Sequence, residues 1–144
     1  MGAARVFDRT TLTAALALGS VALLMIGAQP AVLGEMVERK ALSLEGVGLV
    51  AMGEIIALGV GVALSDALPT KRMRLIAVLA ALATATLDAA TPQMESDAGF
   101  IAIRTLAGLS EGVLVWITTC VLVRSSAPER LASVFFVAQT VAQA

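Results

Sequence analysis

Ionisable side chains inside apolar stretches are the residues of this sequence that could do chemistry. Glu54, Arg104 and Glu111 each interrupt a long run of hydrophobic residues. A charged group near the centre of a membrane-spanning helix costs about 2.5–3.5 kcal/mol, so such residues pair with one another or belong to an ion or proton pathway. Two acids and one base leave one carboxyl group without a cation, and an uncompensated carboxyl group at low dielectric can hold a proton. The chemistry indicated is proton transfer within a membrane.

Helical spacing predicts how these groups are arranged. Seven residues turn an α-helix through about 700°, so Arg104 and Glu111 share one face with Gly108, separated by about 10 Å along the axis. That separation is too long for an easy direct pair, and depth along the helices places Glu54 between them. We therefore expect Arg104 to pair with Glu54, or with Glu111 through water. The alternative interpretation is a static ion pair that only fixes helix packing.

A fourth ionisable residue, Asp88, lies near the end of its apolar run. We expect its side chain to reach the outer interface of the membrane. Gln29 precedes Pro30 within the first apolar run, where the proline frees a backbone carbonyl and bends the helix. This bend is a candidate wall of a polar cavity, and a proline kink without function is the alternative.

The composition indicates lipid as the solvent for most of the surface. Hydrophobic residues make up 58% of the 144 residues and charged residues 15%, against about 25% charged residues in soluble domains, and the mean hydropathy is +0.91. The net charge of −1 and the absence of tyrosine give no basis for a nucleic-acid partner. Without histidine and with one cysteine, the usual zinc, haem and catalytic-triad sites are excluded. We predict no enzyme activity, no metal and no cofactor.

The lengths of the apolar runs predict the fold class. About 20 apolar residues cross the hydrocarbon of a bilayer as a helix. Four runs are long enough or nearly so, and a fifth is still apolar at the last residue. We therefore predict an all-α, polytopic transmembrane helix bundle with four full spans and an incomplete fifth, at residues 12–34, 46–65, 73–91, 99–123 and 129–144. The first run could instead be a signal peptide, but its length favours a retained span.

The distribution of basic residues predicts orientation. Seven Lys and Arg residues precede the first span or follow the second and fourth, and two follow the first. The seven are Arg5, Arg9, Lys71, Arg72, Arg74, Arg124 and Arg130, and the two are Arg39 and Lys40. Because basic loops remain in the cytoplasm, we expect the N-terminus there, in a plasma membrane or bacterial inner membrane.

Small residues indicate where the helices approach closely. Gly53 and Gly61 are spaced for one face of the second span, and Gly108 and Gly112 for one face of the fourth. In lipid, such residues allow helix backbones to come together. We predict that these four glycines are packing positions.

Two motifs resemble the major facilitator superfamily of transporters. The run from Arg104 to Gly112, RTLAGLSEG, resembles its fourth-span signature R-x-x-x-G-x-x-x-G. The stretch LSDALPTKR, with Asp66, Lys71 and Arg72, resembles its loop between the second and third spans, although the glycine positions of that loop pattern hold Val62 and Pro69.

The resemblance implies two six-helix halves around a midplane site. Residues 1–144 would then be a partial N-terminal transmembrane domain, whose partners are the bilayer and the missing C-terminal spans of the same transporter. The implied function is secondary active transport of a small solute by alternating access, with protons as the coupling ion. The alternative is a small multi-span membrane protein that acts as an assembly or regulatory subunit.

The same resemblance suggests roles for individual residues. It implies that Arg104 lines the central cavity, and we expect Glu111, Glu54 and Gln29 to contribute to the same substrate and proton pathway. The loop residues Asp66, Lys71 and Arg72 would latch the cytoplasmic ends of the helices in one conformational state.

Overall fold

The computed structural model describes residues 7–143, and every regular element in that range is helical. The elements are α1 (Arg9–Glu38), α2 (Leu44–Ser65), η1 (Thr70–Arg72), α3 (Met73–Ala90), η2 (Thr91–Gln93), α4 (Asp97–Val123) and α5 (Pro128–Gln143). Helices α1, α2 and α4, and the segment Thr70–Gln93 that contains α3, are long and apolar enough to cross a membrane. The predicted all-α class and the four spanning helices are confirmed.

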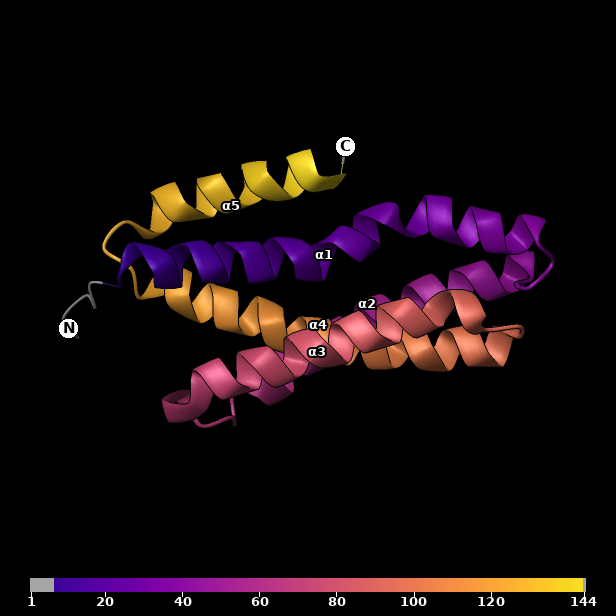
Figure 1. The fold of residues 1–144 in the computed structure, drawn as a ribbon, viewed down its shortest axis with the longest axis horizontal. Coiled ribbons are helices and arrows are strands. Elements are labelled where there is room, and N and C mark those ends of the chain that lie inside the picture. The colour runs from indigo at the N-terminus through magenta and orange to yellow at the C-terminus, as the bar shows by residue number, and fades with distance from the viewer. Residues whose placement is uncertain (1–6, 144) are drawn as a thin grey trace.

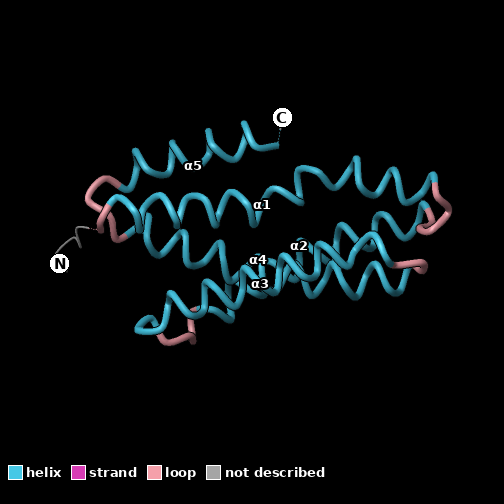
Figure 2. The backbone as a smooth tube through the Cα atoms, viewed as in Figure 1, coloured by secondary structure: helices cyan, strands magenta, loops and turns pink. Residues whose placement is uncertain are grey.

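Successive helices run in opposite directions (Figures 1 and 2). Helices α1, α3 and α5 begin at one end of the bundle, where α2 and α4 finish. This end, called the basic end below, holds Arg9, Lys71, Arg72, Arg74, Arg124 and Arg130. Arg5, which entered the orientation count, and Ala144, at the end of the predicted fifth span, lie outside the described residues.

Helix α4 is the centre of the bundle. It packs against α2, α3 and α1, and it also touches α5, which lies along α1 (Figure 1). A side chain on α4 can therefore meet groups from several other helices, which is the arrangement that the polar residues require.

Helices α1, α2 and α4 begin before the predicted spans because their starts are set by caps rather than by hydropathy, whereas α3 ends one residue before its predicted span. Helix α1 was expected over 12–34 but starts at Arg9, since the Asp8 side chain accepts a hydrogen bond from the Thr11 amide at 3.2 Å. Hydrogen bonds from Thr11 also hold the pKa of the Asp8 carboxyl below its ordinary value. Ser43 and Ser96 cap α2 and α4 in the same way.

The far end of α1 is closed by a left-handed residue. Lys40 has φ 59°, its amide donates to Val37 at 2.9 Å, and the Ala41 amide donates to Met36 at 3.0 Å. These two bonds form a Schellman motif, which satisfies carbonyl groups at the helix end. The helix consequently runs to Glu38 rather than to residue 34.

Glycines let α2 and α4 approach to backbone contact. A Cβ atom at Gly108 would collide with the carbonyl of Glu54, one at Gly112 with that of Leu58, and one at Gly61 with that of Leu109. A Cβ at Gly53 would meet only a side chain, the Thr105 hydroxyl, at 2.9 Å. The close approach at Gly108 places α4 directly against the segment of α2 that contains Glu54.

Apolar clusters lie on both sides of the polar residues along the bundle. The cluster at the end opposite the basic end consists of Leu33, Met36, Leu42, Val50 and Phe100. The cluster nearer the basic end is built around Ala77, Trp116 and Ile117. Glu54, Arg104 and Glu111, which are all buried, lie between these two clusters along the bundle.

Candidate functional site

The buried charges form one cluster centred on Arg104. Its Nε donates to Glu54 Oε2 at 2.9 Å, and its Nη2 donates to Glu54 Oε1. Side-chain exposure is 1% for Arg104 and 0% for Glu54. The predicted pair between α4 and α2 is therefore present, and its bidentate geometry is the strongest that a guanidinium and a carboxylate can adopt.

Glu111 also contacts Arg104 directly. Nη2 of Arg104 donates to Glu111 Oε1 at 3.3 Å, so the two side chains meet directly rather than through the water that was offered as one possibility. The extended guanidinium side chain covers the axial distance between the two residues along their common helix face. The second oxygen, Oε2 of Glu111, is buried and has no hydrogen-bond partner among the described residues.

Asp88 is a third acid in the cluster. Nη1 of Arg104 donates to Asp88 Oδ1 at 2.5 Å, and the Asp88 side chain is 30% exposed. The sequence suggested only that Asp88 reaches the outer interface, and its pairing with Arg104 was missed. The short connection between α3 and α4 could have indicated this pairing, because Asp88 and Arg104 each lie within about two helical turns of that connection.

Gln29 connects α1 to the cluster. Its Nε2 donates to Glu54 Oε2 at 2.5 Å. Gln29 lies beside Pro30, and α1 is visibly bent part of the way along its length (Figures 1 and 2). Four helices thus contribute to what we call the Arg104 cluster: Gln29, Glu54, Asp88, Arg104 and Glu111.

The three carboxyl groups of the cluster differ in their surroundings. Glu54 accepts from Nε and Nη2 along one edge of the guanidinium and also from Gln29, so its carboxylate is the most firmly held counterion of Arg104. Asp88 is the only one of the three that is partly exposed. Glu111 is fully buried with the longest of the contacts to Arg104. Among the described residues, these acids share a single cation, and no group of acids, cysteines or histidines is arranged to hold a metal.

The loop residues predicted as a conformational latch lie elsewhere. Asp66 follows the last residue of α2 at the basic end and accepts a hydrogen bond from Trp116 Nε1 at 3.4 Å. Lys71 and Arg72 are in η1 at the same end and are exposed. The structure therefore does not bring this loop together with the Arg104 cluster.

No family model, no curated protein and no solved structure matches the chain. What the protein does must therefore be argued from the geometry of its own residues.

Proposed function

We propose that these helices belong to a secondary active transporter that moves a small solute together with a proton, and that Glu111 is the proton carrier. The observation that supports this most is the isolation of Glu111 Oε2, a buried carboxyl oxygen without a partner, in a cluster of three acids and one base. Buried acids that exceed the available cations favour binding a proton over remaining charged.

The contacts suggest a division of roles. Glu54 holds the guanidinium from one side by two bonds, so Arg104 keeps a counterion when Glu111 becomes neutral. Protonation of Glu111 then weakens only its 3.3 Å contact with Arg104. Asp88, at the exposed edge of the cluster, is the group positioned to exchange protons with solvent. A proton would enter from solvent at the Asp88 edge of the cluster and reach Glu111 through water, because the guanidinium that both acids contact does not release a proton.

The resemblance to the major facilitator superfamily supports the same proposal. In that family the matching arginine lies in the central cavity, and alternating access involves two halves that move around it. We place the N-terminus in the cytoplasm and the protein in a plasma membrane or bacterial inner membrane, on the basis of the Lys and Arg distribution.

A proton-flux measurement tests the transport function. The protein would be reconstituted into liposomes that enclose a pH-sensitive dye, and a panel of small solutes would be added under an imposed pH gradient. We expect at least one solute to drive proton movement, with Glu111→Gln reducing it to background. Glu45→Gln is the matched control, because Glu45 is exposed in the first turn of α2. Wild-type flux in Glu111→Gln would contradict the assignment of Glu111, and absence of flux with every solute would favour the subunit alternative.

Infrared spectroscopy tests the proton site without knowledge of the solute. A buried, protonated carboxyl group absorbs at higher frequency than a carboxylate, so pH-difference spectra of the reconstituted protein should contain such a band. The band should disappear in Glu111→Gln and remain in Glu45→Gln. An unchanged band in Glu111→Gln would assign the proton to another carboxyl group.

A further inference from the structure

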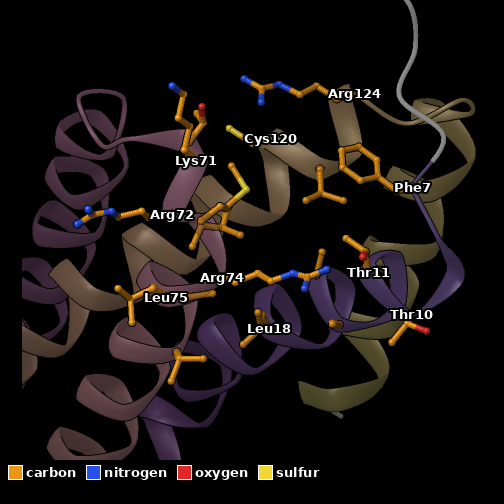
Figure 3. Close-up of a pocket in the computed structure, with 18 of the residues that line it drawn as sticks. Phe7, Thr10, Thr11, Leu18, Lys71, Arg72, Arg74, Leu75, Cys120 and Arg124 are labelled. Carbon is orange, nitrogen blue, oxygen red and sulfur yellow. The ribbon is translucent and has the colours of Figure 1, made fainter.

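A cavity lies at the basic end of the bundle, away from the Arg104 cluster. It measures about 1080 Å³ and is bordered by the first turns of α1, by η1 and the start of α3, and by the last turns of α4 (Figure 3). Part of its lining is apolar and includes Leu18 and the buried residues Ala77, Ile117 and Val121. Pockets that hold drug-sized ligands have volumes of about 300–1,000 Å³, so the cavity is large enough for a ligand of that size.

Cations from three separate elements border this cavity. Lys71 and Arg72 belong to η1, Arg74 belongs to α3, and Arg124 caps α4. Figure 3 shows Lys71 and Arg124 at one rim, while Arg74 extends across the opening toward Thr11. Among the described residues that border the cavity, Asp8 is the one acid.

None of these cations forms an ion pair within 4.0 Å in the part of the chain that the structure describes, although Arg74 lies near enough to Asp8 for their charges to interact. The ion pairs within 4.0 Å there involve only Arg39 and Arg104 as cations. Asp8 is engaged with the Thr11 amide as the cap of α1. Lys71, Arg74 and Arg124 therefore remain available to a ligand.

The preference of basic residues for one side of a membrane explains why these side chains are at this end. That preference does not explain why cations from three elements surround one cavity that has an apolar wall. Phosphate groups bind arginine and lysine through charge-assisted hydrogen bonds, and basic pockets between membrane helices bind anionic lipid headgroups. An apolar wall below the cations matches an acyl chain attached to such a headgroup.

We propose that this cavity binds an anionic phosphate headgroup between Lys71, Arg74 and Arg124, with the attached lipid chain lying against the apolar wall. The same cations would also bind free phosphate, and the experiment below separates the two sources. This site is independent of the proton-coupled transport proposed above, since none of its residues belongs to the Arg104 cluster.

Cys120 is a built-in reporter for occupancy. It is the single cysteine of the chain and it borders the cavity (Figure 3). Its reaction with a maleimide would be followed in delipidated protein in detergent, with dioctanoyl phosphatidylglycerol, dioctanoyl phosphatidylcholine or sodium phosphate added. A ligand at ten times its Kd leaves about a tenth of the protein free, so labelling should slow by up to about tenfold.

The three additions give distinct outcomes. Protection by phosphatidylglycerol alone supports the site and identifies a lipid as the source of the headgroup. Equal protection by sodium phosphate supports the site and identifies free phosphate. Equal protection by phosphatidylglycerol and the zwitterionic phosphatidylcholine, or no protection by any addition, overturns the proposal. These arms use the unchanged chain and do not depend on any variant folding.

Substitutions test whether the cations of the cavity are responsible for the protection of Cys120. Arg74→Gln combined with Arg124→Gln should abolish protection of Cys120 by phosphatidylglycerol. Arg130→Gln is the matched control, because Arg130 is an exposed cation at the same end of the bundle that does not border the cavity. The unfolding temperature of each variant shows whether it is folded. Full protection in the folded double variant would overturn the site.

Discussion

At the scale of single residues, Arg104 joins three acidic side chains that come from three helices. Its five donors are spread over a planar fork, which allows one side chain to contact Glu54, Asp88 and Glu111 at the same time. A lysine ammonium presents a point charge without this fork. The identity of the base is therefore as important as its charge.

Removal of this guanidinium should strongly destabilise the protein. We expect Arg104→Gln to lower the free energy of unfolding by about 3–5 kcal/mol, because it leaves buried carboxyl groups without a cation. Thermal unfolding in detergent measures the change. Addition of Glu54→Gln to the same protein should recover part of the loss, since one of the uncompensated acids is then neutral.

The matched control is the exposed pair between Arg39 and Glu35. Their side chains are 61% and 50% exposed and 2.8 Å apart, and an exposed pair at this helical spacing contributes only about 0.3–0.5 kcal/mol. Arg39→Gln should therefore change the unfolding temperature very little. If the two arginine variants were equally stable, the cluster would have no structural role.

At the scale of elements, the contact between α2 and α4 positions the cluster. Glu54 and Arg104 meet because glycines on both helices allow the backbones to touch, with Gly108 opposite the Glu54 carbonyl. The packing glycines and the buried ion pair are thus parts of one arrangement. Any side chain added at the contact separates the two charges as well as the two helices.

Gly108→Ala tests this contact. The new methyl group would collide with backbone rather than with a flexible side chain, so we expect a loss of about 1–3 kcal/mol in the free energy of unfolding. Gly59→Ala is the control in α2, because a Cβ there meets nothing within 4 Å. At a helix position with free space, alanine should leave the stability unchanged or raise it slightly. If both changes had the same effect on the free energy of unfolding, backbone contact would not be the reason why Gly108 must be a glycine.

The end of α1 offers a stabilising substitution. Lys40 adopts φ 59° at the position of the Schellman motif where glycine is preferred, and a left-handed conformation costs an ordinary residue about 1–2 kcal/mol. Lys40→Gly should therefore raise the unfolding temperature. Arg39→Gly should lower it, since Arg39 has right-handed helical angles and glycine gains nothing there. The opposite order of the two variants would contradict the assigned turn.

At the scale of the whole molecule, the two polar features occupy different positions along the bundle. The Arg104 cluster lies among four helices, and the basic cavity lies at the end where Lys71, Arg74 and Arg124 gather. One set of groups is suited to protons and the other to anionic headgroups. The orientation of the bundle determines the side of the membrane from which protons reach the Arg104 cluster and headgroups reach the cavity.

Cysteine accessibility in intact cells tests the orientation. In a Cys120→Ser background, Lys40→Cys and Ala67→Cys place single thiols in exposed positions at opposite ends of the bundle. We expect a membrane-impermeant maleimide to label Lys40→Cys in intact cells, and Ala67→Cys only after permeabilisation. The reverse pattern would place the N-terminus outside.

The sequence by itself determined the helical class and the four spanning runs, and it offered Glu54 as one of two candidate partners for Arg104. These follow from hydropathy and from helical spacing, which are local properties of the chain. Helix ends differed by a few residues because capping by Asp8 and Ser43 depends on single hydrogen bonds. Only the tertiary structure added Asp88 to the cluster, brought Arg104 within reach of Glu111 and gathered cations from three elements around one cavity. Those features depend on how the helices are rotated and on how far long side chains extend, and both are decided by packing among helices.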